Sequence, residues 1–224
     1  VFLPSILYTN CRSLNTWKLA ELQSYAEIYK PGLICLTETW LDDNKQEIIQ
    51  IDGYKNHFAN RSKRIGGGVA ILSSTHLGAT IISTHKTRTL SAAWILISYK
   101  QCKPLIVCCI YHPPNCDQTT TLDYITNTIL KLTPKYPNAH YVLAGDYNRL
   151  PTNGICEQFG LKNLVDFPTR ENVTLDLILT DVPEYQPAKK LAPLSRNDHC
   201  CIFVEGQQFH KSKYIKTEKR LITP

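Results

Sequence analysis

Apolar residues recur at helical spacing in two stretches of the chain. In residues 14–29 they return every three or four positions, and the Pro31-Gly32 pair ends the pattern. The same spacing runs from Leu122 to Leu132 and stops ahead of a proline. These patterns predict two amphipathic helices, and the segment from Asp43 to Gln50 predicts a further short one.

Short apolar runs bounded by polar turns predict seven or more strands. The runs are SILYT (5–9), residues 33–36, GVAILS (68–73), AWILISY (93–99), PLIVCCIY (104–111), HYVLAG (140–145), LDLILT (175–180) and CCIFV (200–204). The turn KQCK joins two of them at hairpin length. Helices therefore alternate irregularly with strands, which predicts one α/β or α+β domain of mixed sheets with helices packed outside.

Composition narrows the class of protein. The chain has 224 residues, of which 43% are hydrophobic and 20% charged, as in a globular domain with a sizeable core. No apolar run approaches eighteen residues, and the first residues lack the features of a signal peptide. The absence of methionine indicates a piece of a longer polypeptide.

The cysteines and charges add two expectations. Nine cysteines without a CxxC pair favour free thiols in a reducing compartment over a zinc site. The net charge of +6 allows a polyanionic partner. The basic end HKSKYIKTEKR has no apolar period, so we assign residues 1–205 to the domain and residues 206–224 to a linker.

Polar residues gather at the predicted strand ends. They are Asn10, Glu38, Tyr111, His112, Asp146, Asn148, Asp176, Asp198 and His199. Each one alone is more often a turn former, a solvated charge or a local hydrogen-bonding group. Because the rims of layered sheets are where sites are built, the joint pattern favours a functional site over a series of turns.

The residue types point to hydrolysis of a phosphate ester. Carboxylates such as Glu38 bind a hard cation, and Asp146 can orient or deprotonate a water molecule. His199, held by Asp176, would face the charge that develops on a phosphate. The chain has no GxSxG motif and no GxxxxGK[ST] motif, so the Gly66–Gly68 run predicts a hairpin turn instead of a nucleotide loop.

Seven motifs in order resemble the exonuclease-endonuclease-phosphatase superfamily. They are YTN, LTETW, GGGVAIL, IYHPPN, GDYN, TLDLIL and SRNDHC, and they span residues 6–204. Within the superfamily they are most similar to the apurinic/apyrimidinic-type endonuclease domain of non-LTR (LINE) retrotransposons, in particular the chicken-repeat-like clade. The resemblance implies a four-layered α/β sandwich of two mixed sheets flanked by helices.

The same resemblance implies an activity, partners and a place in the cell. It implies a Mg²⁺-dependent endonuclease, with Mn²⁺ as the alternative ion, that nicks double-stranded target DNA. The nick leaves a 3′-hydroxyl that primes reverse transcription by a fused reverse transcriptase following the linker. The expected compartment is the nucleus, and no membrane is involved.

The resemblance also implies roles for individual residues. Asp146 is expected to activate the attacking water, with Asn148 as its partner at the phosphate. The other expected catalytic residues are Tyr111, His199, Asp176 and Asn10, and the expected metal ligands are Glu38, Asn10 and Asp198. The DNA contacts expected from basic and polar loop residues are Arg61, Lys63, Arg64, Arg149, Thr169, Arg170, Arg196 and Asn197.

Two positions depart from the family pattern. Repair-type members carry an acid two residues after the first Asn, where this chain has Arg12, so a second metal ligand is in doubt there. LINE members commonly have Ser-Asp-His, where this chain has Asn197 before Asp198. An asparagine can still donate a hydrogen bond, so activity is expected to survive.

Three alternatives remain open at this point. A lipid or inositol phosphatase of the same superfamily would share the metal site, and a repair endonuclease would prefer abasic DNA. A catalytically inactive DNA-binding module would lack one of the seven motifs, and all seven are present.

Overall fold

Twelve strands form two six-stranded mixed sheets in the part of the chain that the computed structural model describes, residues 3–42, 44, 46–61, 66–98 and 103–207. The first sheet has the order β11-β12-β1-β2-β4-β3 and the second the order β5-β6-β7-β8-β10-β9. The first contains β1 (Ile6–Asn10), β2 (Leu33–Thr37), β3 (Tyr54–Ala59), β4 (Val69–Ser74), β11 (Lys189–Leu191) and β12 (Cys201–Val204). The second contains β5 (Thr80–Lys86), β6 (Ser91–Ile97), β7 (Leu105–Tyr111), β8 (His140–Asp146), β9 (Lys162–Asn163) and β10 (Asp176–Thr180).

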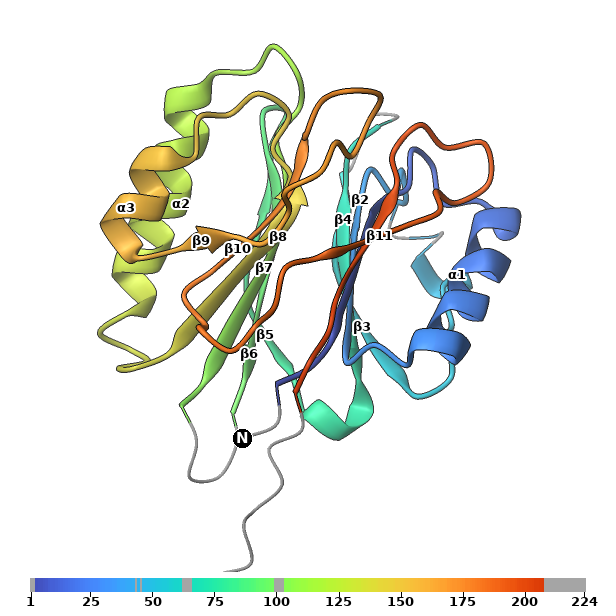
Figure 1. Cartoon of the computed structure of the whole chain (residues 1–224), viewed down its shortest axis with the longest axis horizontal. Coiled ribbons are helices and arrows are strands. Elements are labelled where there is room, and N and C mark those ends of the chain that lie inside the picture. Colours follow the sequence, from blue (N-terminus) through green and yellow to red (C-terminus); the bar gives the residue numbers. More distant parts are fainter. Residues whose placement is uncertain (1–2, 43, 45, 62–65, 99–102, 208–224) are drawn as a thin grey trace, which may run out of the picture.

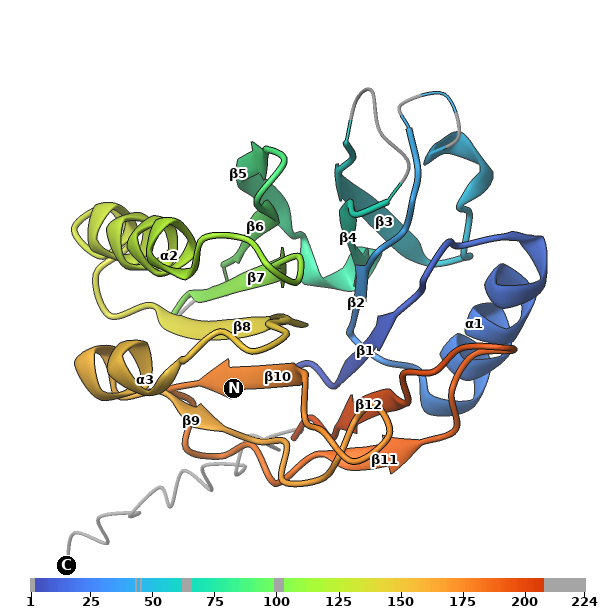
Figure 2. The same ribbon diagram turned by 90° about the horizontal axis from the view of Figure 1, so that it is seen from above.

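Three helices cover the outer faces of the two sheets. Helix α1 (Thr16–Tyr29) lies outside the first sheet, and α2 (Gln118–Leu132) and α3 (Asn153–Phe159) lie outside the second (Figures 1 and 2). Three apolar clusters hold these layers together, one between the sheets and one under each set of helices. The predicted four-layered α/β sandwich is confirmed.

Burial explains why the sequences of the inner strands are continuous runs of apolar residues. All seven residues of β7 and all five of β2 are buried, because each strand packs against the other sheet on one face and against a helix layer on the other. The outer strands are different. β5 is largely exposed, and in β3 only His57 and Ala59 are buried.

The polar and short elements are those that the apolar pattern did not predict. Strands β3, β5, β9 and β11 and helix α3 were not predicted, because their sequences are polar, short or both. The predicted helix from Asp43 to Gln50 is only a 3-10 turn at Gln46–Ile48, and part of that segment lies outside the described residues. The predicted KQCK turn also lies partly outside them.

Strand direction brings the predicted polar residues to one rim. Strands β1 and β2 are parallel, as are β7 and β8, so each pair ends at the same edge of its sheet. Tyr111 lies opposite Asp146 in that register, and Asp146 lies opposite Asp176 at the start of the antiparallel β10. The carboxyl ends of the parallel strands therefore meet the beginning of an antiparallel one.

Two further findings concern membrane-spanning helices and cysteines. Among the described residues no helix is both long and apolar enough to cross a bilayer. The eight cysteines in the described part of the chain are all free thiols, and most of them are buried.

Candidate active site

Six predicted site residues meet where the rims of the two sheets face each other. Asn10 ends β1, Tyr111 ends β7, Asp146 ends β8 and Asp176 begins β10. Glu38 directly follows β2, and His199 lies two residues ahead of β12. Hydrogen bonds between side chains of the two sheets show that the set forms one site.

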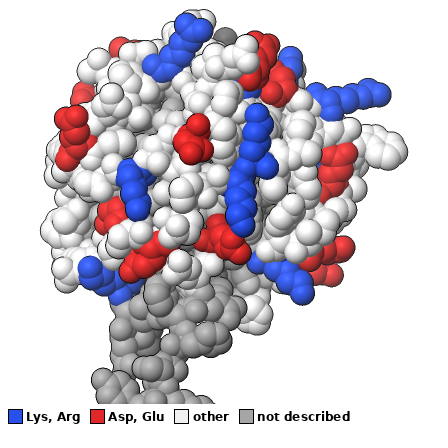
Figure 3. Space-filling view, in the orientation of Figure 1, with Lys and Arg blue, Asp and Glu red and all other residues white. Residues whose placement is uncertain are grey.

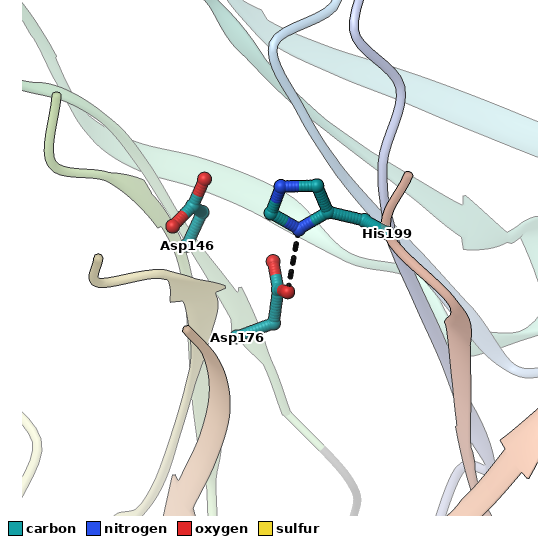
Figure 4. Close-up of side chains that lie close together, drawn as sticks. All are labelled: Asp146, Asp176 and His199. Carbon is teal, nitrogen blue, oxygen red and sulfur yellow. Dashed lines mark hydrogen bonds and ion pairs between the residues drawn. The ribbon is translucent and has the colours of Figure 1, made fainter. Parts of the chain in front are cut away.

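His199 and Asp176 form a buried pair. The His199 Nδ1 lies 2.7 Å from the Asp176 Oδ2, and the imidazole faces the carboxylates of Asp146 and Asp176 (Figure 4). Burial alone would lower the His199 pKa, but the hydrogen bond to Asp176 and the charges of the nearby carboxylates outweigh it, so the pKa is raised. The geometry therefore favours an imidazolium that can donate from its other nitrogen.

Asp176 is held from two further directions. The Tyr8 hydroxyl donates to its Oδ1 at 2.7 Å and lies 2.9 Å from the Thr37 hydroxyl. The Thr169 Oγ1 accepts from the backbone N–H of Asp176 at 3.1 Å. Because both carboxylate oxygens and the backbone are bonded, this acid is fixed as the partner of the histidine.

Asp146 is a buried carboxylate whose pKa is higher than that of an exposed aspartate. Asn10 Nδ2 donates to its Oδ2 at 2.8 Å, and the backbone N–H of Asn148 donates to its Oδ1 at 2.9 Å. Burial, followed by the charge of Asp176, raises the Asp146 pKa to about 7, while His199 and the two hydrogen bonds oppose the rise. A carboxylate whose pKa lies near neutrality is suited to accept a proton from water.

Glu38 is oriented by its neighbours. Its Oε1 accepts from Asn10 Nδ2 at 3.2 Å and its Oε2 from Trp40 Nε1 at 3.1 Å. The loop that carries it is pinned to the glycine run, because the backbone N–H of Trp40 donates to the Gly67 carbonyl at 3.0 Å. Gly67 and its successor Gly68 both have positive φ, so the GGG motif supports the Glu38 loop.

The oxygen donors fit a hard divalent cation. Glu38 is half-buried and its carboxylate is positioned by donors on both oxygens. The Oδ1 of Asp198 is buried and has no hydrogen-bond partner among the described residues. Carboxylate oxygens are ligands that Mg²⁺ takes in proteins, so Glu38 and Asp198 could hold such an ion. Asn10 turns its Nδ2 toward Glu38 and its Oδ1 toward the backbone N–H of Arg12, so it orients Glu38 instead of offering its oxygen beside it. Ligand atoms of Asp146, Asp176 and His199 also lie within 4.8 Å of one another, but the imidazole Nδ1 is already bonded to Asp176.

Asn148 and Tyr111 flank Asp146. Asn148 has a φ of +50°, and its Nδ2 donates to the His112 carbonyl at 2.7 Å. Burial, with the charges of Glu38 and Asp146, raises the pKa of the Tyr111 hydroxyl, so it stays protonated. The guanidinium of Arg61 lies 5.6 Å from the centre of the Tyr111 ring. His112 is buried and lies 2.9 Å from the Thr121 hydroxyl.

Asp198 is bound by two arginines. Its Oδ2 lies 3.4 Å from Arg12 Nη1 and 2.7 Å from Arg170 Nη2. The neighbouring Asn197 donates from its Nδ2 to the Asn10 carbonyl, so the loop ahead of β12 is tied to the end of β1. Arg12, at the position where the resemblance leads one to expect an acid, thus pairs with another acid of the site.

The remaining predicted DNA contacts have different environments. Arg149 and Arg196 are exposed, and a hollow of about 410 Å³ beside Asn148 is lined in part by Arg149 and Arg170. The Thr169 side chain is buried, because its hydroxyl accepts from the backbone of β10, so it supports Asp176 and does not face solvent. Lys63 and Arg64 lie outside the described residues.

Several residues of the site were not predicted from the sequence. Tyr8 lies inside the apolar run SILYT, which predicts a strand and no role for its hydroxyl. Trp40 follows Glu38 by two positions, and Lys18 is a buried lysine whose Nζ donates to the carbonyls of Cys11 and Arg12 at 2.7 and 3.1 Å. Positive φ values cluster here as well, at Arg12, Ser13, Glu38, Trp40, Asn148 and Arg196. Such strained backbone is typical of functional sites.

Comparisons with known proteins agree with this geometry. A family model described as the endonuclease/exonuclease/phosphatase family matches residues 7–196. No curated protein is similar enough in sequence to count as a match. The endonuclease domain of TRAS1, a telomere-specific non-LTR retrotransposon, is 16% identical with a TM-score of 0.66, covering 90% of this chain and 97% of that one.

Two further solved structures have the same fold. The AP endonuclease LMAP from Leishmania major is 13% identical with a TM-score of 0.68, covering 91% of this chain and 87% of that one. D. rerio TDP2 complexed with a single-strand DNA product is 12% identical with a TM-score of 0.67, covering 92% and 99%. At these identities the likeness concerns the fold.

Proposed function

Because the chain belongs to the endonuclease/exonuclease/phosphatase family, we propose that it is a Mg²⁺-dependent endonuclease that nicks double-stranded DNA. Membership makes the chain a metal-dependent phosphodiester hydrolase. The observation that carries the proposal is the pairing of a near-neutral carboxylate, Asp146, with a histidine held by Asp176 at one rim. This arrangement offers a proton acceptor and a charged donor on either side of a phosphate.

The chain's own residues divide the reaction between them. Asp146, oriented by Asn10 and by the backbone of Asn148, accepts a proton from the attacking water. The His199 imidazolium, held by Asp176, donates to a phosphate oxygen as negative charge develops there. A divalent ion held by Glu38, which Asn10 orients, and by the Oδ1 of Asp198 would polarise the phosphate and neutralise its charge.

Surface charge and structural likeness favour DNA as the substrate. Arg12, Arg149, Arg170 and Arg196 are at least partly exposed, on the loops around the site or next to its residues in the sequence. The chain has a net charge of +6, which suits a polyanion. The endonuclease domain of the retrotransposon TRAS1 has the same fold over 90% of this chain and 97% of its own length.

We further propose that the nick serves retrotransposition. In that role the product carries a 3′-hydroxyl that primes reverse transcription in the nucleus. A reverse transcriptase would follow residues 206–224 in the parent polypeptide. The likeness to TRAS1 and the ordered motifs support this role.

A repair endonuclease acting on abasic DNA is the second candidate. The likeness to the Leishmania AP endonuclease favours it. The position of Arg12, which is an acid in repair-type members and here bonds to Asp198, speaks against it. A phosphatase of the same family would use the same histidine and carboxylates on a smaller substrate.

Nicking of supercoiled plasmid tests the proposal. We expect relaxed circles with Mg²⁺, none with EDTA, and a rate about a thousandfold lower for Asp146→Ala. Asp123→Ala, which removes an exposed carboxylate on α2, is the matched control and should nick normally. Nicking without metal, or full nicking by Asp146→Ala, would contradict the proposal.

The same assay separates the candidates. An abasic duplex cut many-fold faster than intact DNA would favour repair, and release of phosphate from an inositol phosphate would favour a phosphatase. Direct extension of the nick by a polymerase, without prior removal of a phosphate, would identify the 3′-hydroxyl that priming requires.

A further inference from the structure

Asp198 joins two cations that come from distant parts of the chain. Arg12 lies between β1 and α1, and Arg170 lies in the segment between β9 and β10. Both guanidinium groups bind the same oxygen of Asp198, at 3.4 and 2.7 Å. The two arginines therefore meet at one acid, Asp198, which directly precedes His199 in the sequence.

Hydrogen bonds within the chain fix the backbone around this bridge. The N–H of Arg12 donates to Asn10 Oδ1 at 2.9 Å, and its carbonyl accepts from Lys18 Nζ at 3.1 Å. These bonds hold Arg12 at a φ of +40°, a conformation that costs a non-glycine residue energy. On the other side, Arg170 pairs as an isolated bridge with His199.

The bridge carries a net positive charge and unused donors. Two guanidinium groups outweigh one carboxylate by one unit of charge. The side chains of Arg12 and Arg170 are 57% and 41% exposed. Each guanidinium has five N–H donors, and both groups contact a single oxygen of Asp198. Further N–H groups of each arginine can therefore bind a ligand from the solvent side. A planar fork of this kind matches the oxygens of a phosphate.

We propose that Arg12, held to Arg170 through Asp198, is a phosphate-binding residue of the active site that contacts the DNA backbone beside the scissile phosphate. The inference rests on the proposed nuclease function. Arg12 would supply a fixed positive charge that attracts a phosphate. An acidic residue at this position would instead attract a cation. It follows that the site binds one divalent ion, held by Glu38 and the Oδ1 of Asp198, because the two guanidinium groups occupy the Oδ2 of Asp198 and Arg12 offers no carboxylate to a second ion.

Salt dependence of DNA binding tests the phosphate contact. Binding of a labelled duplex is measured in EDTA, so that it is not cut. Arg12→Ala should weaken binding about tenfold at 0.1 M salt and reduce the slope of log K against log salt by about one. Arg12→Lys should keep the slope, and Lys131→Ala, which removes an exposed charge near the end of α2, should leave both values unchanged.

These outcomes separate phosphate binding from a merely structural role. If Arg12 only positioned Asp198, the Arg12→Ala variant would nick more slowly but keep the salt slope of the wild type. That result would overturn the inference about Arg12. Nicking by the wild type would still support the nuclease function. Arg12→Gln gives a second neutral variant should the alanine variant melt early. A wild type that neither binds nor nicks DNA would overturn both proposals.

Metal stoichiometry gives an independent readout. Titration of the protein with Mn²⁺ alone, followed by calorimetry, should give one site for the wild type and two for Arg12→Asp, which turns the cation into a ligand. Lys131→Glu makes the same change of charge far from the site and should keep one site. Two Mn²⁺ sites in the wild type, or one site in Arg12→Asp, would contradict the one-ion conclusion.

Discussion

The pKa of Asp146 is set by its neighbouring residues and its burial more than by its being an aspartate. An exposed aspartate has a pKa near 4, whereas burial and the charge of Asp176 raise that of Asp146 to about 7. The charge of His199 and the hydrogen bonds from Asn148 and Asn10 limit this increase in pKa, because they favour the charged form of Asp146. The same carboxylate on an exposed turn would be a poor base.

Tyr8 is predicted to support catalysis without touching substrate. Its hydroxyl donates to Asp176, so Tyr8→Phe leaves a buried carboxylate oxygen without that donor. We expect the free energy of unfolding to fall by about 1 to 2 kcal/mol and nicking to slow about tenfold. Urea unfolding and single-turnover nicking measure the two effects.

Tyr54→Phe is the matched control for this prediction. The Tyr54 hydroxyl donates to the Pro31 carbonyl at 2.5 Å, near the C-terminal end of α1. That variant should lose stability and keep its nicking rate. Equal nicking by the Tyr8 and Tyr54 variants would show that Tyr8 is only a core residue.

Residue type and position in the sequence were enough to find the acids of the site but not their supports. Asp146 and Glu38 follow apolar runs of the sequence, so their place at a rim could be predicted. Tyr8 could not, because a tyrosine inside a buried strand has the same sequence pattern whether or not its hydroxyl meets Asp176 in the other sheet. The two arginines on Asp198 likewise depend on contacts between segments far apart in sequence.

At the scale of an element, β8 positions Asp146 through the glycine before it. A Cβ on Gly145 would clash with the carbonyl oxygen and side chain of Ile110 in β7. We expect Gly145→Ala to push the two parallel strands apart, to cost about 2 to 3 kcal/mol in the free energy of unfolding and to abolish most nicking. Urea unfolding and the plasmid assay measure these losses.

Gly154 provides the control for that substitution. It lies in α3, and a Cβ there would meet nothing within 4 Å. Gly154→Ala should therefore stabilise the protein by up to about 1 kcal/mol and leave nicking unchanged. A Gly145→Ala variant as stable and active as Gly154→Ala would contradict the close approach of β7 and β8.

Strand β3 carries a histidine that makes stability depend on pH. Burial, with the charge of Lys55, lowers the His57 pKa to about 4, while an unfolded histidine titrates near 6.5. Between these values the unfolded state binds a proton that the native state does not, so stability falls as the pH drops from 6.5 to 4. The loss should reach about 3 kcal/mol at the acid end.

Replacement of the histidine isolates its share of this pH dependence. His57→Gln keeps a polar partner for Ser73, whose hydroxyl lies 3.0 Å from the imidazole, but cannot titrate. Urea unfolding at pH 7.5, 5.5 and 4.5 should show a flatter profile for His57→Gln than for the wild type. His76→Gln, at an exposed position, should follow the wild type. Parallel profiles for His57→Gln and the wild type would exclude the buried histidine as the cause.

The elements that the sequence did not predict are those that need the rest of the fold to exist. Strand β5 is mostly exposed and pairs only with β6, and β9 has two residues. Their sequences carry little apolar signal because they bury little surface. The inner strands could be predicted, since burial on both faces demands continuous apolar residues.

On the scale of the whole molecule, the site exists only because two sheets pack face to face. The first sheet supplies Asn10, and Glu38 and His199 beside it, while the second supplies Asp146 and Asp176. The bonds from Asn10 to Asp146 and from His199 to Asp176 cross that interface. Packing of the central core and assembly of the site are therefore one event, which the order of motifs alone could not reveal.

The distribution of charge favours the rim as the place where DNA, the proposed substrate, would bind. On the face in Figure 3 the basic and acidic side chains are interspersed, so that face offers no continuous positive field. The exposed or half-exposed arginines proposed for DNA contact, Arg12, Arg149, Arg170 and Arg196, would supply about four phosphate contacts. Four contacts predict a slope of log K against log salt of about −3.6, or a loss of roughly 150-fold in affinity between 50 and 200 mM salt.

That modest slope distinguishes local contacts from a general attraction by net charge. Binding of a labelled duplex to the wild type in EDTA, measured across this range of salt, gives the slope directly. If the net charge of +6 governed binding, a variant lacking the remote charges of Lys30 and Lys131 would lose affinity as strongly as one lacking Arg149 and Arg196. We expect only the second pair to matter, because charges more than a Debye length from the DNA are largely screened at physiological salt.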